Sequence, residues 1–214
     1  MTKKTLIGIN GKIGAGKDTV GEIIQKLCIT NSGSKFEIKK FAGKLKQTAS
    51  LLTGIPIKKF EDQEFKTKAL GREWCYPTEW QGREHWVEMT VREFLQRLGT
   101  EAMRVGLHTN VWVNALFADY KEEPTNVLKG EGYHLEDVYP NWIITDMRFP
   151  NEMEAVVENG GITIRVVRPG TVTEDHPSET ALDDAAFDYE IINDGSMEEL
   201  VSKVRSILVA EHIL

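Results

Sequence analysis

The chain has 214 residues, of which 41% are hydrophobic and 28% are charged, and its formal net charge is −7. This size and composition are typical of a globular domain with a sizeable core, and the acidic balance argues against a nucleic-acid or anionic-membrane binder. Two cysteines, Cys28 and Cys75, provide neither a disulfide framework nor the spacing of a zinc site. The N-terminus lacks the apolar segment of a signal peptide and no apolar run reaches membrane-span length, so we expect a cytoplasmic protein.

The first predicted elements are a strand, a glycine-rich loop and a helix. Apolar residues from Leu6 indicate a short buried strand, and apolar residues at helical spacing follow over 20–27. Between them the pattern G-x-x-x-x-G-K runs from Gly11 to Lys17, in the context that a phosphate-binding loop requires. Backbone N–H groups and the helix dipole favour an anion here, and glycines let phosphate oxygens approach the backbone. The predicted ATP-binding residues are Gly11, Gly14, Gly16, Lys17, Asp18 and Thr19.

Three residues at the end of this loop define the expected chemistry. Lys17 would supply a mobile positive charge to the β- and γ-phosphates of ATP. Asp18 stands where a Ser or Thr usually holds magnesium, and Thr19 follows it, so the metal contact departs from the usual pattern. A glycine turn that only opens a helix is the competing interpretation.

A second strand and helix follow a turn over 31–34. Residues 36–42 are predicted to form a strand whose charged residues indicate an edge position or one solvated face. Residues 43–53 are predicted to form a helix that ends at Gly54. Lys44 lies just past the strand, where ligands bind in open α/β sheets, so it is a candidate phosphate contact; an exposed lysine of the first helical turn is the alternative.

Two segments lack a clean hydrophobic period. We interpret residues 57–89, which mix aromatic and charged side chains, as short helices and a loop inserted over the acceptor site. Aromatic residues that merely anchor a long loop would give the same pattern. Residues 121–140 are polar and contain glycine, so we interpret them as a surface loop.

Helices are predicted on both sides of position 105. Thr90, with Glu93 three residues later, has the form of a capping box at the start of the first. Arg92 and Arg104 are candidate phosphate contacts, because guanidinium groups bond phosphate bidentately, although most arginines on helix surfaces are only solvated. For Trp112, in the next helix, we favour core packing over stacking on a base.

The strand predicted over 142–146 ends in an acid. A buried strand that ends in Asp146 has the shape of a Walker-B strand, whose acid orients magnesium through its water shell. Arg148 follows the end of this strand and is the best-placed arginine for the phosphoryl group in transfer. The alternative for Asp146 is an N-cap of the helix that begins near Pro150. We therefore assign catalytic roles to Lys17, Arg148 and Asp146, and water-mediated metal contacts to Asp18, Thr19 and Asp146.

The last predicted elements are two strands and a helix. The strands cover 162–168 and 189–192, and Ser196 caps the final helix. The polar segment 169–186 between the strands is a predicted lid or nucleotide-contact loop. Because strands and helices alternate, we expect one P-loop kinase domain over 1–214, of α/β class, with a mostly parallel sheet covered by helices on both faces. The phosphate loop, the acid-ended strand and the arginines should then meet at the carboxyl edge of the sheet.

The combined motifs resemble the phage-type deoxynucleoside monophosphate kinase family, and they extend over nearly the whole chain. The motifs are Gly16-Lys17-Asp18-Thr19, Leu98-Gly99-Thr100 with Arg104, Thr145-Asp146-x-Arg148, His176-x-Ser178-Glu179, and 188–195.

The resemblance implies transfer of the ATP γ-phosphate to a deoxynucleoside 5′-monophosphate, with Mg²⁺. It implies that Lys44, Arg104 and Arg148 hold the acceptor phosphate and that Glu179 contacts the acceptor; we add Arg92 to these substrate-binding candidates. Members of the family often carry a basic residue where this chain has Ile13. The neighbouring Lys12 is expected to point elsewhere.

Two alternatives stay open on sequence alone. One is a P-loop kinase for another small acceptor, of the phosphomevalonate or dephospho-coenzyme A type. The other is a nucleotide-binding switch that acts through a protein partner. The expected partners are ATP and a deoxynucleoside monophosphate, with no nucleic acid and no membrane; a homodimer is the assembly we consider, in the host cytoplasm if the protein is phage-encoded.

Overall fold

The computed structural model describes residues 6–80, 82–129, 132–170 and 180–214. The chain divides into two compact units. The sheet unit comprises Met1–Phe41 and Ala115–Leu214, and the helical unit comprises Ala42–Asn114. Among the described residues, no helix has both the length and the apolar character needed to cross a bilayer.

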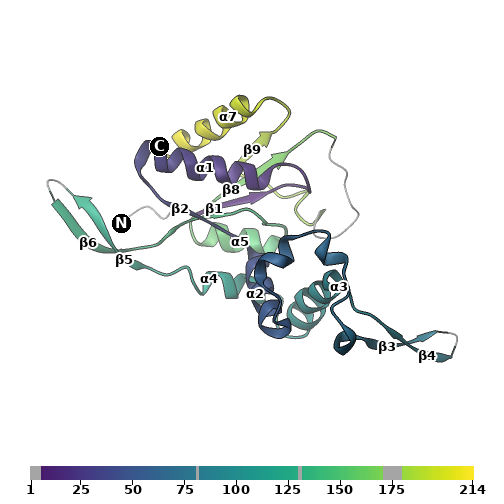
Figure 1. Ribbon diagram of the computed structural model, residues 1–214. Coiled ribbons are helices and arrows are strands. Elements are labelled where there is room, and N and C mark those ends of the chain that lie inside the picture. The colour runs from purple at the N-terminus through teal and green to yellow at the C-terminus, as the bar shows by residue number, and fades with distance from the viewer. Residues whose placement is uncertain (1–5, 81, 130–131, 171–179) are drawn as a thin grey trace. The chain divides into compact units, whose positions relative to one another are not determined.

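The sheet unit is built on one parallel five-stranded sheet (Figure 1). Every neighbouring pair of strands is parallel, as expected from the alternation of strands and helices. The strand that carries the phosphate loop lies at the centre, where Ile7 pairs with Ile143 on one side and Ile162 on the other. In spatial order the strands are β2 (Phe36–Lys39), β7 (Asn141–Ile144), β1 (Leu6–Asn10), β8 (Ile162–Val167) and β9 (Tyr189–Ile192). The predicted edge position of the charged second strand is confirmed.

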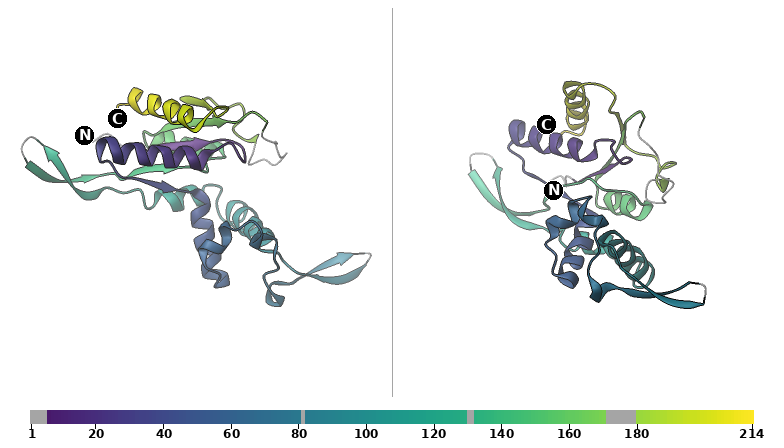
Figure 2. Two further views of the ribbon diagram at one scale, coloured as in Figure 1. Left: turned by 45° about the horizontal axis from the view of Figure 1, so that its top comes forward. Right: turned by 45° about the vertical axis from the view of Figure 1, so that its right-hand side comes forward.

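Helices cover both faces of this sheet (Figures 1 and 2). Helices α1 (Lys17–Ser32) and α7 (Met197–Ala210) lie on one face, and α5 (Pro150–Glu158) lies on the other. A Cβ added to Gly21 would stand 2.7 Å from a methyl carbon of Thr145, so α1 packs closely on β7. This close approach fixes the start of α1 over the carboxyl ends of the central strands.

Two expectations for the sheet unit are wrong. The segment expected to be a polar loop is an antiparallel hairpin of β5 (Glu123–Lys129) and β6 (Gly132–Val138). Leu135 of this hairpin is 70% exposed, and the segment shows no clear alternation of apolar and polar residues. The expected turn over 31–34 begins two residues late, because the Asn31 and Ser32 side chains donate to carbonyls one turn back and continue α1 to Gly33.

The helical unit contains short elements. Its core consists of Ala49, Phe60, Val91, Phe94 and Leu98. The short helices expected within 57–89 are confirmed as three 3₁₀ turns, but residues 76–80 and 83–87, expected to be loop, pair as antiparallel strands. The elements of residues 41–117, of which α2 begins and α4 ends in the sheet unit, are α2 (Phe41–Thr53), η1 (Ile57–Glu61), η2 (Phe65–Thr67), η3 (Arg72–Trp74), β3 (Tyr76–Trp80), β4 (Arg83–Val87), α3 (Val91–Gln96), the π-helix η4 (Arg97–Val105) and α4 (Val111–Phe117).

Of the capping box predicted at Thr90 and Glu93, the Thr90 half is confirmed. The Thr90 hydroxyl accepts the N–H of Glu93 at 3.2 Å and begins α3. The carboxylate of Glu93 accepts the Tyr76 hydroxyl at 2.5 Å and pairs with Arg97 at 3.0 Å. Trp112 is 5% exposed and its indole N–H donates to the Gly99 carbonyl at 2.9 Å, which confirms core packing over an exposed stacking surface.

Candidate active site

The loop between β1 and α1 has the conformation that its glycines permit. Gly14 and Gly16 have φ angles of 80° and 100°, in the left-handed region that side chains disfavour. A Cβ at Gly11 would lie 2.5 Å from the carbonyl oxygen of Val166, so only glycine fits against β8 there. Gly16 is the N-cap of α1, a 16-residue helix whose first N–H groups therefore face the loop. This is the geometry of an anion-binding helix N-terminus.

The Lys17 ammonium crosses this loop. Its Nζ donates to the carbonyl oxygens of Gly11 at 2.5 Å and Lys12 at 2.9 Å. The cation therefore lies beside the loop backbone, within reach of any phosphate that the loop N–H groups bind.

Asp18 joins the start of α1 to the ends of two strands. Its Oδ1 accepts the Thr145 hydroxyl at 2.6 Å and the Lys40 ammonium at 2.9 Å. Burial raises the pKa of this carboxyl, but the hydrogen bonds from Thr145 and Lys40 and the charges of Lys40 and Lys17 outweigh it, so the pKa is lowered overall. Asp18 is therefore a carboxylate near neutral pH, at the position of the usual Ser or Thr.

Asp146 has a helix-capping contact, though not the one considered as an alternative. Its Oδ1 accepts the N–H of Phe41, the first residue of α2, at 2.8 Å. The N-cap of α5 is Phe149, so an N-cap role for Asp146 at α5 is wrong. Asp146 follows β7 and lies at the same sheet edge as the loop, as expected for an acid-ended strand.

The backbone that carries Arg148 is fixed by two groups that sequence reasoning missed. The Asn10 side-chain amide donates to the Met147 carbonyl at 2.9 Å and ties the end of β1 to this segment. Glu152 is 2% exposed, and its Oε2 accepts the N–H groups of Arg148 at 2.7 Å and Phe149 at 3.1 Å. A Glu two residues after Pro150 was the available signal for this cap.

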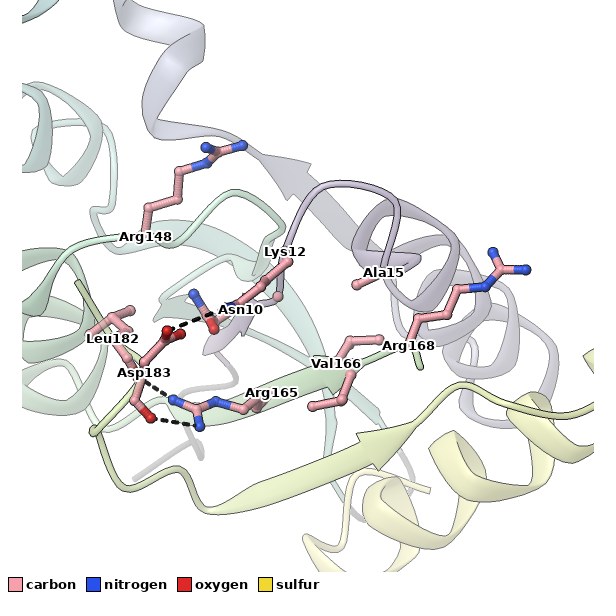
Figure 3. Close-up of a pocket in the computed structure, with 11 residues that line it drawn as sticks. Asn10, Lys12, Ala15, Arg148, Arg165, Val166, Arg168, Leu182 and Asp183 are labelled. Atoms are coloured by element: carbon pink, nitrogen blue, oxygen red, sulfur yellow. Dashed lines mark hydrogen bonds and ion pairs between the residues drawn. The ribbon is translucent and has the colours of Figure 1, made fainter. Parts of the chain in front are cut away.

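A pocket of about 120 Å³ opens beside the phosphate loop (Figure 3). Lys12 pairs with Asp183 at 3.2 Å on its wall, and Arg165 donates to the carbonyls of Leu182 and Asp183. Four basic residues and one acidic residue contribute to its lining, which gives its surroundings an excess of positive charge. The lining residues are Asn10, Gly11, Lys12, Ala15, Arg148, Arg165, Val166, Val167, Arg168, Leu182 and Asp183.

The cations of the pocket point in different directions. Lys12, which was expected not to lie between the bound phosphates, pairs with Asp183 and lines the pocket together with Arg148. Ile13, at the position of the basic residue in the family pattern, is 51% exposed. In Figure 3 the Arg148 and Arg168 side chains extend away from the Lys12–Asp183 pair in different directions, so their guanidinium groups reach the pocket only by rotating.

The remaining candidates fall in other parts of the chain. Lys44, Arg92 and Arg104 belong to the helical unit, where Arg92 donates to the Gln63 side chain at 3.4 Å. Thr19 is half-buried in the first turn of α1. Glu179, with most of the predicted lid segment, lies outside the described residues.

Comparison with known proteins identifies the family. A family model described as deoxynucleotide monophosphate kinase matches residues 78–204, more than half of the chain. A protein of Acanthamoeba polyphaga mimivirus, provisionally named deoxynucleotide monophosphate kinase, is 28% identical over 94% of this chain and 94% of its own length.

Two phage enzymes are also similar. The deoxynucleotide monophosphate kinase of Enterobacteria phage T4 is 33% identical over 56% of this chain and 46% of its own length. The deoxynucleoside-5′-monophosphate kinase of Escherichia phage T5 is 23% identical over 88% and 89% of the two chains. The chain, with its parallel sheet and glycine-rich loop, belongs to the deoxynucleotide monophosphate kinase family.

Proposed function

We propose that this protein transfers the γ-phosphate of ATP to a deoxynucleoside 5′-monophosphate, giving the diphosphate and ADP. The observation that carries the proposal is that the phosphate loop and the segment of Arg148 line one cationic pocket at the carboxyl edge of a parallel sheet. Family membership favours this acceptor over the phosphomevalonate and dephospho-coenzyme A alternatives and over a switch protein.

ATP fits the residues of the loop. The N–H groups at the start of α1 would hold the phosphates, and Lys17 would move from loop carbonyls 2.5 and 2.9 Å away to the β- and γ-oxygens. Because the ammonium is already at the loop, this exchange needs only side-chain rotation.

The site is compatible with a Mg²⁺ ion that takes most of its direct ligands from the nucleotide phosphates. Among the described residues, no group of three or more His, Cys, Asp or Glu side chains could hold a metal. Magnesium at kinase sites keeps several waters and takes most direct ligands from phosphates. We propose that Asp18, Thr19 and Asp146 contact it mostly through water; when bound, the ion neutralises charge on the transferring phosphoryl group.

Phosphoryl transfer requires the protein chiefly to position the reactants and to neutralise the charge of the phosphates. The β–γ bridging P–O bond breaks, and a new bond forms between the γ-phosphorus and an acceptor phosphate oxygen. We propose that Arg148 rotates onto the transferring group, since Glu152 and Asn10 already fix its backbone. Lys12 would exchange Asp183 for a phosphate oxygen and supply the charge that Ile13 cannot.

Arg92, Arg104 and Lys44 are proposed as acceptor contacts on the basis of the sequence, and so is Glu179. The remaining partners are small nucleotides, and the ATP-rich cytoplasm of a host cell is where we propose that the reaction takes place.

A panel of acceptors tests the proposal. Purified protein would be incubated with ATP, Mg²⁺ and each common nucleoside monophosphate in its deoxy and ribo forms, and ADP release would be recorded. We expect release with one or more deoxy monophosphates at rates well above the rate without acceptor. Release that is equal with and without every acceptor would contradict the proposal.

A further inference from the structure

The turn after β9 contacts the phosphate loop from the side. Asn193 follows β9 directly, and its backbone N–H donates to the Val167 carbonyl at 2.7 Å. Its side-chain Nδ2 donates to the carbonyl oxygen of Ala15 at 2.9 Å. A Cβ added to Gly16 would stand 2.6 Å from the same Nδ2. The carboxamide of Asn193 therefore lies against the peptide that joins Ala15 to Gly16.

This contact fixes the direction of a backbone donor. In a trans peptide the C=O and the following N–H point in opposite directions. No cis peptide occurs among the described residues. Because the Ala15 carbonyl points to Asn193, the N–H of Gly16 points away from it. Gly16 is the N-cap of α1, so this N–H belongs to the group of donors that a phosphate would meet first.

The turn that carries Asn193 is held by contacts outside the phosphate loop. The ammonium of Lys203, on α7, donates to the Ile192 carbonyl at 2.6 Å and to Asp194 at 3.1 Å. Lys203 of α7 therefore contacts the residue before Asn193 and the residue after it. A loop that is already ordered loses less conformational entropy on binding a ligand than a loop that the ligand must order.

We propose that Asn193 is a positioning residue for ATP, which presets the Ala15–Gly16 peptide so that the phosphate loop is formed before nucleotide binds. This inference rests on the proposed function, because it takes ATP as the ligand of the loop. Asn193 does not act on the acceptor or on the transferring group. Its loss therefore changes ATP binding and leaves acceptor binding unchanged.

The first test compares a variant of Asn193 with a variant of an exposed residue on the same strand. Asn193→Ala removes the donor to Ala15, whereas Glu190→Gln changes an exposed side chain of β9 that has no part in the proposed contact. We expect Asn193→Ala to weaken binding of a non-hydrolysable ATP analogue about tenfold, by calorimetry, since that is the net worth of one hydrogen bond. The KM of the acceptor should stay within about twofold, and Glu190→Gln should match wild type within about twofold.

A second variant keeps the test sharp if the alanine variant folds poorly. Asn193→Asp preserves the shape, but its carboxylate cannot donate to Ala15 and adds a negative charge. It should bind the ATP analogue more weakly than Asn193→Ala at pH 8. Relative to wild type at each pH, it should recover as the pH falls to about 4, where a large share of the carboxyl is protonated and can donate. A role in stability alone would lower the free energy of unfolding of this variant and leave its affinity for the ATP analogue equal to that of wild type.

The outcomes separate the two proposals. Equal ATP affinity of wild type and Asn193→Ala, or equal losses for ATP and acceptor, would overturn the inference and leave the proposed function standing. Asn193→Asp without recovery at low pH would also overturn it. Wild-type protein that binds no ATP analogue would overturn the proposed function, and the inference with it.

Discussion

The two compact units hold their polar side chains in different ways. In the sheet unit the hydrogen bonds around the phosphate loop join distant residues: Asn10 to Met147, Asp18 to Thr145 and Asn193 to Ala15, at separations of 137, 127 and 178 residues. In the helical unit such bonds are more local, as for Trp112 to Gly99 and Tyr76 to Glu93, at 13 and 17 residues.

This difference in the sequence separation of hydrogen-bond partners indicates which parts of the reaction depend on long-range contacts of the fold. The phosphate loop is organised by the ends of β7, β8 and β9, so it exists only when the whole sheet has formed. Candidate acceptor contacts in the helical unit lie on short, locally stabilised elements. We therefore expect substitutions in the sheet unit to affect catalysis and stability, and those in the helical unit to affect acceptor binding alone.

The largest expected effect is on turnover, at Arg148. Arg148→Ala should lower kcat on the order of 10³-fold, because an arginine that stabilises charge on a transferring phosphoryl group is worth that much. The hydrogen bond from the Arg148 N–H to Glu152 does not require the Arg148 side chain, so we expect the backbone of this segment to keep its conformation. Steady-state kinetics of the variant, with Arg205→Ala on the exposed face of α7 as the control, measures this. A kcat loss below tenfold would remove Arg148 from the catalytic residues.

The next effect is on stability, at Glu152. Glu152→Ala leaves two backbone N–H groups without their acceptor in a buried place and should lower the free energy of unfolding by about 2–3 kcal/mol. Urea unfolding measures this, and Glu154→Ala on the exposed side of the same helix should change it by less than about 0.5 kcal/mol. Equal effects of the two substitutions would show that the buried cap contributes nothing.

A smaller effect is expected on acceptor binding, at Arg92 in the helical unit. Arg92→Ala in the helical unit should raise the KM of the acceptor about tenfold, as expected for the loss of one charge-assisted contact, and should leave the KM of ATP unchanged. Arg72→Ala, an exposed arginine of the same unit, is the matched control. A rise in the KM of ATP with no change for the acceptor would reverse the proposed division of roles.

The smallest effect is a pH dependence at Asp18. Its pKa is lowered in the folded protein, so the contribution of its carboxylate to stability is present above the ordinary pKa and is lost as the pH falls through the folded value. Asp18→Asn should therefore be less stable than wild type at pH 7, and the difference should shrink below about pH 4. Urea unfolding of both proteins from pH 7 to pH 3 measures this. A difference that widens on acidification would contradict the assignment.

Features that neighbouring residues in the sequence encode could be predicted, whereas features without such a local pattern could not. The phosphate loop, the acid-ended strand before Arg148 and the parallel sheet were predictable, because glycine spacing and apolar runs report them locally. The hairpins of β3 with β4 and of β5 with β6 were missed because their sequences show no clean alternation of apolar and polar residues.

Within the site, the supporting contacts were the least predictable part. Asn193 and Ala15 meet only after β9 is placed beside β8, and nothing near either residue indicates the other. The contact of Lys12 was not predictable for the same reason, since its partner Asp183 lies 171 residues away. Glu152 could have been found, because its spacing after Pro150 is that of a cap.

The central claim is that the phosphate loop delivers a phosphoryl group to a nucleotide acceptor. The most direct measurement follows the label from γ-³²P ATP in the presence of Mg²⁺ and a deoxynucleoside monophosphate, with wild type and Lys17→Ala and with Lys26→Ala on the exposed side of α1 as the control. The account predicts that wild type and Lys26→Ala transfer the label to the deoxynucleoside diphosphate, and that Lys17→Ala loses most of this transfer. Label that appears only as inorganic phosphate, or transfer that survives in Lys17→Ala, would contradict it.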